Sequence, residues 1–124
     1  MSKTILIVDD SATMTMSVKS SLELNGFKVS TAADGLIALD ILQTGFKPDL
    51  IITDINMPRM GGFALIQEIK RIAALRFVPI LTLTTESDPA KRAEGKKLGA
   101  TGWLVKPLSG PDLLKVIKQV LPGA

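Results

Sequence analysis

The sequence predicts an α/β fold in which a parallel sheet of five strands is covered by helices. Five short apolar runs recur along the 124 residues, and the stretches between them are long enough for helices. Three of the runs are almost continuous Val, Ile and Leu, which is typical of strands buried on both faces of a sheet. We therefore predict five βα units in a single domain over residues 1–124, whose hydrophobic content of 46% can fill one core.

The predicted strands coincide with the five apolar runs. In chain order these are TILIV, KVSTA, DLIIT, VPILTL and TGWLV, at residues 4–8, 28–32, 49–53, 78–83 and 101–105. No side-chain motif recurs at a fixed spacing between them. The repeated units are therefore expected to build one sheet and not a solenoid.

The first two helices are predicted from a shared apolar face and from capping residues. Met14, Val18 and Leu22 recur at four-residue spacing and would share one face of the first helix. The Asn25-Gly26 pair follows as a C-terminal cap. Asp34 is the predicted N-cap of the second helix, since it precedes the next stretch with helical spacing.

The last three helices have similar signals. Apolar spacing predicts the third over residues 63–70. The fourth is expected to begin near Pro89, a favoured residue of the first turn, and to stop at Gly99. The fifth begins at Pro111. Its expected buried residues are Leu113, Leu114, Ile117, Val120 and Leu121.

Composition excludes several kinds of chemistry. The chain has no cysteine and no histidine, so disulfides, thiolate metal sites and imidazole bases are absent. Catalysis would have to use carboxylates, hydroxyls, lysine or a bound cation. The apolar runs are far shorter than the ~20 residues of a membrane span, and no signal-peptide pattern opens the chain. We expect a cytoplasmic protein that does not enter a membrane.

The charge pattern indicates a solvated surface. Net charge is +3, from 15 basic and 12 acidic residues, and the basic residues are spread over several helical segments. The densest basic group, KRAEGKK at residues 91–97, is interleaved with small and acidic residues, as on an exposed helix face. We expect a monomer that binds no nucleic acid.

Chemically active side chains gather at the predicted carboxyl ends of the strands. In an open α/β sheet, ligands bind outside these ends. The first strand ends in the pair Asp9-Asp10, the third in Asp54, the fourth in Thr84 and the fifth in Lys106. Only the second strand contributes nothing chemical to this edge.

The alternative interpretation is that these residues are helix caps. Asp10 or Ser11 could cap the first helix, and Thr84 or Ser87 the fourth. Capping does not account for Lys106, which lies between a strand and a proline, or for Asp54, which is followed by a loop.

Three carboxylates at one edge need positive charge. Two carboxylates ~4 Å apart repel by about 4 kcal/mol at an effective dielectric of 20, which is large against a domain stability of roughly 5–15 kcal/mol. Lys106 offsets part of this repulsion, and a hard divalent cation offsets more. A few oxygen ligands with open positions for water suit Mg²⁺, whereas Ca²⁺ would recruit more ligands.

The chain resembles the receiver domains of two-component response regulators, and most closely the stand-alone, CheY-like chemotaxis members. The matching segments are ILIVDD, DLIITDINMPRMGG, PILTLTT and GATGWLVKP, in family order and spacing, and they cover nearly all of the chain. The resemblance implies a flavodoxin-like (βα)5 fold, a doubly wound parallel sheet with strand order 2-1-3-4-5. Its crevice would lie between strands one and three, beside Asp9-Asp10 and Asp54.

The resemblance also implies an acceptor site. Asp54 would take a phosphoryl group from a phosphohistidine of a partner, either a CheA-like sensor histidine kinase or a phosphotransfer protein. Mg²⁺ would be held by Asp10, by Asp54 and by the backbone carbonyl of Asn56, with Asp9 acting mainly through water.

Two further family residues would contact the phosphoryl oxygens. Thr84 would donate a hydrogen bond, and Lys106 would supply a fixed positive charge. The Lys106-Pro107 bond is expected to be cis, as is common in the family. Pro58 would stiffen the loop after Asp54, and Gly61-Gly62 would let it turn into the third helix.

Signalling in the family couples a threonine to an aromatic residue on strand five. Here these are Thr84 and Trp103, where Tyr or Phe is commoner, and the larger indole is expected to fit the inward position poorly. Alternatively, Trp103 is a partly exposed anchor for a partner. Asn56 and Glu86 occupy positions that tune the lifetime of the phosphoryl group, and this pair predicts a short-lived signal.

Several functional alternatives stay open on the sequence alone. The protein is expected to be no enzyme beyond its own autophosphorylation and autodephosphorylation. Its target would be a protein such as the flagellar motor switch, although a phosphate sink or a relay intermediate is also compatible. Two alternative hypotheses for the function are a pseudo-receiver that is never phosphorylated and a phosphatase of the haloacid-dehalogenase type. In such phosphatases, however, the nucleophile belongs to a DxD motif that ends the first strand, whereas Asp54 ends the third.

Overall fold

The protein forms a five-stranded parallel sheet in the predicted order. The structure is a computed structural model that describes residues 2–123. Its strand order is β2-β1-β3-β4-β5, and all four strand pairs are parallel. The strands are β1 (Thr4–Val8), β2 (Lys28–Ala32), β3 (Leu50–Thr53), β4 (Ile80–Thr84) and β5 (Gly102–Val105). The doubly wound α/β fold is thereby confirmed.

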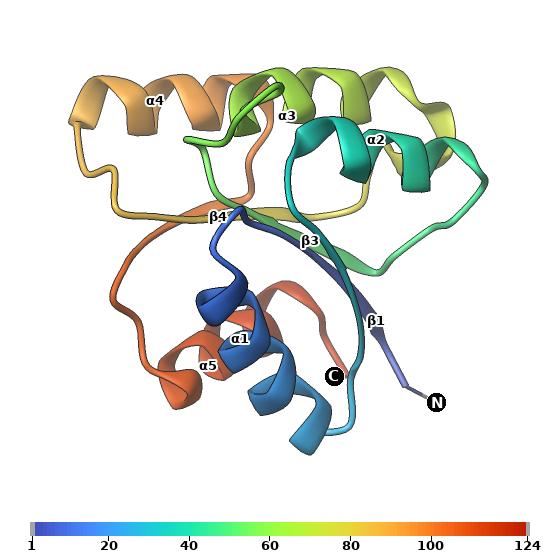
Figure 1. Ribbon diagram of the computed structural model, residues 1–124, viewed down its shortest axis with the longest axis vertical. Coiled ribbons are helices and arrows are strands. Elements are labelled where there is room, and N and C mark those ends of the chain that lie inside the picture. Colours follow the sequence, from blue (N-terminus) through green and yellow to red (C-terminus); the bar gives the residue numbers. More distant parts are fainter. Residues whose placement is uncertain (1, 124) are drawn as a thin grey trace.

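Five α-helices cover the sheet in two layers. They are α1 (Ala12–Leu24), α2 (Gly35–Gln43), α3 (Gly62–Arg71), α4 (Pro89–Leu98) and α5 (Gly110–Val120). Figure 1 shows α1 and α5 together on one face of the sheet, and α2, α3 and α4 on the other. A short 3-10 helix, η1 (Ala73–Leu75), follows α3 and was not expected from the sequence.

The sheet separates two hydrophobic cores. Ile5 and Ile7 of β1 belong to the core beneath α1 and α5, whereas Leu6 and Val8 belong to the core beneath α2 and α3. Each strand residue therefore finds an apolar environment whichever face it points to. This explains why β1 is a continuous apolar run without alternation.

Helix caps agree with the sequence at two helices and differ at a third. Ser11 caps α1 by accepting from the Met14 amide, and Asp34 caps α2 by accepting from the Ile37 amide. The N-cap of α4 is Asp88, and not Thr84 or Ser87 as in the capping interpretation. Asp88 directly precedes the first helical turn, whereas Thr84 belongs to β4.

The buried face of α1 also differs slightly from the prediction. Val18 and Leu22 are buried as expected, but Thr15 takes the third buried position and Met14 is only partly buried. The hydroxyl of Thr15 donates to the backbone carbonyl of Asp9 at 3.4 Å. This contact ties the first turn of α1 to the end of β1.

Strand register brings the functional strand ends to one edge. Val8 pairs with both Ala32 and Thr53, and Thr84 pairs with Val105. The ladder continues one residue further, because the Asp54 amide donates to the Val8 carbonyl at 2.9 Å and the Lys106 amide donates to the Thr84 carbonyl at 2.8 Å. The side chains just beyond the strands consequently start from ordered backbone. Within residues 2–123, no helix combines the length and the apolar character needed to cross a membrane.

Candidate functional site

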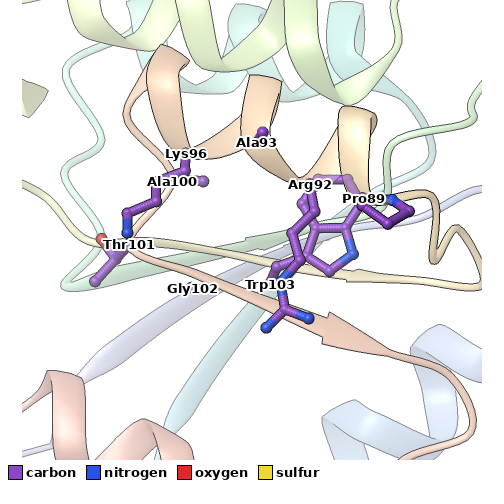
Figure 2. Close-up of a pocket in the computed structure, with 8 residues that line it drawn as sticks. All are labelled: Pro89, Arg92, Ala93, Lys96, Ala100, Thr101, Gly102 and Trp103. Atoms are coloured by element: carbon purple, nitrogen blue, oxygen red, sulfur yellow. The ribbon is translucent and has the colours of Figure 1, made fainter.

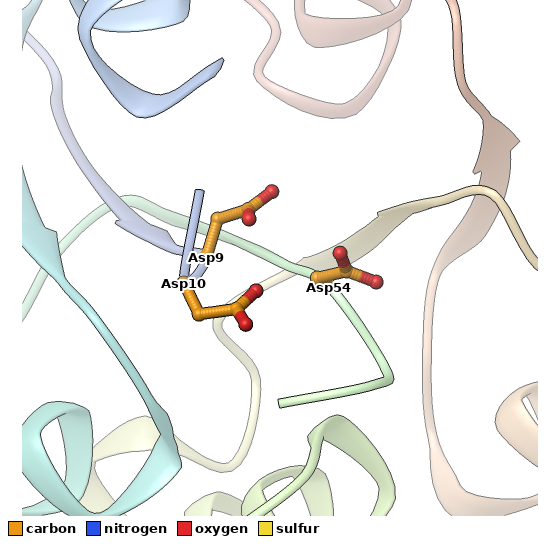
Figure 3. A group of neighbouring side chains, drawn as sticks. All are labelled: Asp9, Asp10 and Asp54. Atoms are coloured by element: carbon orange, nitrogen blue, oxygen red, sulfur yellow. The ribbon is translucent and has the colours of Figure 1, made fainter. Parts of the chain in front are cut away.

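Three carboxylates converge at the carboxyl edge of the sheet. Asp9, Asp10 and Asp54 each offer an oxygen atom, and these atoms all lie within 4.8 Å of one another. Figure 3 shows Asp9 and Asp10 beyond the end of β1, with their carboxylates on the side that faces Asp54, which follows β3. Asp9 and Asp54 are buried, and Asp10 is exposed. The adjacency predicted from the strand ends is present in the fold.

Lys106 reaches this cluster from the end of β5. Its Nζ atom lies 2.7 Å from Oδ2 of Asp9 and 3.0 Å from Oδ2 of Asp54. Burial by itself would lower the pKa of Lys106, but the hydrogen bonds to Asp9 and Asp54 and the charges of these two carboxylates outweigh burial and raise the pKa above its ordinary value. The ammonium is therefore charged throughout the physiological range. The Lys106-Pro107 bond is cis, as the resemblance implies.

Backbone amides hold the second oxygen of each buried carboxylate. The Ser11 amide donates to Oδ1 of Asp9 at 2.9 Å. The Ile55 amide donates to Oδ1 of Asp54 at 2.6 Å. Each carboxylate is thus oriented by one amide and one ammonium, and its plane is set before any ligand arrives.

The donor set of the cluster fits a hard cation. Every candidate ligand atom is a carboxylate oxygen, with no sulfur or imidazole nitrogen in the chain. Three carboxylates against one ammonium leave a formal excess of two negative charges. Oxygen-only coordination with a few protein ligands is the pattern that Mg²⁺ uses. Asn56, whose carbonyl is the further expected ligand, is exposed two residues beyond Asp54.

The loop after Asp54 packs closely on the acceptor. A Cβ atom at Gly62 would collide with the backbone carbonyl of Asp54, and one at Gly61 would lie 2.8 Å from the carbonyl of Ile55. Neither glycine has a positive φ; Gly61, the N-cap of α3, has a φ of −80°. The two glycines therefore permit the turn into α3 by leaving out a Cβ atom and not by a left-handed backbone. They allow close approach, and the positive φ of this loop, 64°, belongs to Arg59.

Thr84 and Trp103 are joined through the backbone of Glu86. The buried hydroxyl of Thr84 accepts a hydrogen bond from the Glu86 amide at 3.2 Å. The indole Nε1 of Trp103 donates to the Glu86 carbonyl at 3.0 Å. The Glu86 carboxylate forms an ion pair with Lys91 of α4 at 3.3 Å. A displacement of Thr84 would therefore reach the indole through a single residue.

Trp103 is buried, contrary to the expectation of a partly exposed anchor. Its exposed fraction is 9%, so it is no partly exposed anchor. The indole is accommodated in the interior because it packs against Phe63, with ring centroids 6.2 Å apart, and against the backbone of Gly95. The space beside it opens into a cavity of about 400 Å³ between α4 and β5 (Figure 2). The cavity is lined by Pro89, Arg92, Ala93, Lys96, Ala100, Thr101, Gly102 and Trp103.

One contact near the site had no signal in the sequence. Arg59 of the loop after Asp54 forms an ion pair with Asp34, the N-cap of α2. The two residues are 25 positions apart in the chain. Taken separately, Asp34 is explained as a helix cap and Arg59 as an exposed loop residue. Only the fold, which places the loop beside the start of α2, brings them together.

Comparison with known proteins agrees with this arrangement. Residues 5–118 match the family model described as the response regulator receiver domain. The chain therefore belongs to the response regulator receiver domain family.

Particular relatives extend this assignment. The chain is similar to the chemotaxis protein CheY4 of Vibrio cholerae, with 45% sequence identity, 98% of this chain and 100% of that chain covered, and a TM-score of 0.93. It is 34% identical to protein PilH of Pseudomonas aeruginosa over 96% of this chain and 98% of PilH. It is also 37% identical to a probable transcriptional regulator, ycf27, of Cyanophora paradoxa, with 96% of this chain and 48% of that protein covered. The chain spans about half the length of ycf27 and of several other curated relatives that it matches.

Proposed function

We propose that this receiver domain accepts a phosphoryl group on Asp54 from the phosphohistidine of a partner kinase. The observation that carries the proposal is the position of the Asp54 carboxylate, which lies beside Asp9 and Asp10 and 3.0 Å from the ammonium of Lys106. A nucleophile that must approach a negatively charged phosphoryl group needs nearby positive charge.

In the proposed reaction, a carboxylate oxygen of Asp54 attacks phosphorus while the bond from phosphorus to the histidine nitrogen breaks. The histidine belongs to the partner, since this chain has none. The product is an acyl phosphate on Asp54. Lys106 and the hydroxyl of Thr84 would then contact the phosphoryl oxygens, the first as a fixed charge and the second as a hydrogen-bond donor.

Magnesium is part of this proposal. Asp10, Asp54 and the carbonyl of Asn56 would hold the ion, and Asp9 would act mainly through water. When bound, Mg²⁺ supplies positive charge that neutralises the charge developing on the phosphoryl oxygens. Asp9 and Asp54 already have their carboxylate planes oriented by backbone amides, so they need little reorganisation to accept a cation.

The proposed output is a change in the surface formed by α4, β5 and α5. Support comes from the hydrogen bonds that connect Thr84 to Trp103 through Glu86, because Trp103 lies in β5 and Glu86 pairs with α4. Candidate partners are a CheA-like kinase and a target such as the flagellar motor switch. A phosphate sink or relay intermediate would use the same site. The proposal includes a cytoplasmic location and no enzymatic activity beyond self-phosphorylation and self-dephosphorylation.

Intact-mass spectrometry after incubation with acetyl phosphate and Mg²⁺ tests the acceptor role. We expect one added phosphoryl group in the wild type and none in Asp54→Asn. Asp40→Asn, which changes an exposed aspartate of α2, is the matched control and should be phosphorylated normally. An unmodified wild type would favour a pseudo-receiver that acts only by binding. Sustained hydrolysis of p-nitrophenyl phosphate would instead favour a phosphatase.

The output surface is tested separately. A pull-down of candidate targets with and without beryllofluoride, which mimics the phosphoryl group on Asp54, should show binding that depends on beryllofluoride. Equal binding in both conditions would contradict a phosphorylation-dependent output.

A further inference from the structure

The loop between Asp54 and α3 contains a tight turn at Arg59. The Met60 amide donates to the Pro58 carbonyl at 2.7 Å, which closes a three-residue turn around Arg59. Arg59 has a φ of 64°, and it is the only residue other than glycine with a positive φ in the described part of the chain. Turns of this kind are rare and strained for a residue with a Cβ atom, and they persist only where surrounding contacts maintain them.

The side chain of Arg59 provides such contacts. Its Nε and Nη2 atoms each lie 2.7 Å from Oδ2 of Asp34. Asp34 is only 4% exposed, and its Oδ1 accepts from the Ile37 amide at 3.0 Å as the N-cap of α2. One buried carboxylate therefore anchors the start of α2 with one oxygen and the loop with the other. Such charge-assisted hydrogen bonds are stronger than neutral ones.

A backbone contact reinforces the same junction. The Gly35 amide, next to Asp34, donates to the Met60 carbonyl at 3.0 Å. A Cβ atom at Gly35 would lie 2.6 Å from that carbonyl, so the approach requires glycine. Arg59 at the centre of the tight turn and Met60 after it are consequently both fastened to the start of α2.

Helix capping alone does not explain this arrangement. Asp34 caps α2 with Oδ1 and needs no arginine for that role. Arg59 has an unfavourable backbone conformation, and its side chain contacts Asp34 from that conformation. The loop that benefits is short, and it begins at the acceptor Asp54 and includes Asn56.

We propose that the Asp34–Arg59 pair positions the loop after Asp54 so that its backbone can take part in binding a divalent cation. Arg59 and Asp34 are positioning residues in this account, since they act through the loop and not on the reacting atoms. The predicted effect on phosphorylation rests on the proposed function. The anchoring of the loop to α2 is independent of that function.

The sign of the expected effect separates positioning from simple electrostatics. Removing the positive charge of Arg59 from the loop after Asp54 would, through charge alone, strengthen the binding of a cation. Loss of positioning would weaken it. Substitutions of residues that orient metal ligands lower metal affinity by roughly 10–100-fold, and we expect about tenfold here because the loop keeps its backbone contact to Gly35.

Arg59→Asn is the decisive variant. Asparagine tolerates a positive φ but cannot reach Asp34, so the substitution removes the ion pair without adding backbone strain. Asp34→Asn is the second variant, because asparagine is also a good N-cap and keeps α2 capped. Arg59→Lys retains the charge but offers one donor nitrogen in place of the two in the guanidinium, and it should give an intermediate result. Arg71→Asn, which removes an exposed ion pair with Glu68 on α3, is the control.

Two measurements test the proposal. In metal-free protein, hydrogen exchange at the amides of Gly35 and Met60 should be faster in Arg59→Asn and Asp34→Asn than in the wild type and Arg71→Asn. A Mg²⁺ titration followed by amide shifts of Asn56 and Met57 should give a dissociation constant about tenfold higher in Arg59→Asn. Unchanged exchange in Arg59→Asn overturns the anchoring, and unchanged or tighter Mg²⁺ binding overturns the positioning role. A wild type that binds no Mg²⁺ counts against the proposed function, and the exchange result still decides the anchoring.

Discussion

Trp103 lies directly against the backbone of Gly95, so that a methyl group on Gly95 would be 2.7 Å from Cζ3 of the indole. The ring is held in this position because its Nε1 donates to the Glu86 carbonyl at 3.0 Å and because it packs against Phe63. The glycine in the middle of α4 therefore compensates for the size of the aromatic residue on β5. A helix normally avoids glycine at such a position.

This contact predicts that Gly95→Ala destabilises the protein although alanine favours helices. Overpacking costs about 1–3 kcal/mol, against a gain of about 1 kcal/mol in helix propensity, so we expect a net loss of roughly 1 kcal/mol. Urea unfolding followed by the fluorescence of Trp103, the one tryptophan, measures it. In a Trp103→Phe background the same substitution should be neutral or stabilising by circular dichroism. Equal losses in both backgrounds would show that the indole is not the cause; Glu94→Ala in α4 is the control.

Replacing Lys106 by Met should destabilise the protein in the absence of divalent cations. The substitution leaves the Asp9 and Asp54 carboxylates without the ammonium that lies 2.7 and 3.0 Å from them. Breaking a buried pair costs about 3–5 kcal/mol and an exposed pair about 0–1 kcal/mol; for a side chain that is 14% exposed we expect about 2 kcal/mol. Urea unfolding with and without Mg²⁺ is the measurement, and Mg²⁺ should restore part of the loss. Lys115→Met, at an exposed position of α5, is the control.

The Asp34–Arg59 pair predicts a specific dependence of stability on pH. The hydrogen bond from Arg59, followed by that from the Ile37 amide, holds the pKa of Asp34 below its ordinary value although burial opposes this. A lowered carboxyl pKa stabilises the fold above the unfolded pKa of about 3.9, and this contribution is lost as the pH falls through the folded value. The stability difference between wild type and Arg59→Asn should therefore be constant near neutrality and shrink below about pH 4.

Urea unfolding at a series of pH values checks this prediction. In an Asp34→Asn background, Arg59→Asn should show no comparable change in acid. A stability difference that grows as the pH falls would have the wrong sign for an ionised Asp34 and would contradict the assignment.

The phosphorylated state is predicted to be short-lived. By the family resemblance, Asn56 and Glu86 would tune the access of water to the acyl phosphate; they lie in the loops that follow β3 and β4. We expect self-dephosphorylation within seconds to minutes in the presence of Mg²⁺. Intact mass followed over time after removal of acetyl phosphate measures the decay. Phosphoprotein that persists for hours would rule out this lifetime.

Much of the fold was accessible from the sequence because its signals are local. An apolar run such as residues 4–8 predicts a strand buried on both faces, and Asp34 predicts the start of a helix. The carboxylate cluster was accessible because parallel strands end at one edge, so Asp9 and Asp54 could be placed together without knowledge of any contact.

Other features could not be predicted from the sequence, because they depend on which distant residues the fold brings into contact. Nothing near Arg59 in the chain indicates that it meets Asp34, or that it and not the following glycines has the positive φ. Likewise, no local pattern links Gly95 to Trp103. The indole can be buried because Gly95 of α4 has no side chain, and the sequence of β5 alone does not reveal this.

Lys106 is 97 positions from Asp9 and 52 from Asp54 in the chain, yet all three meet at hydrogen-bonding distance. No contiguous fragment that lacks either β1 or β5 retains the complete charge arrangement. An assay that detects phosphorylation of Asp54 would thus also report native tertiary structure, because misassembled or truncated molecules lack this charge arrangement.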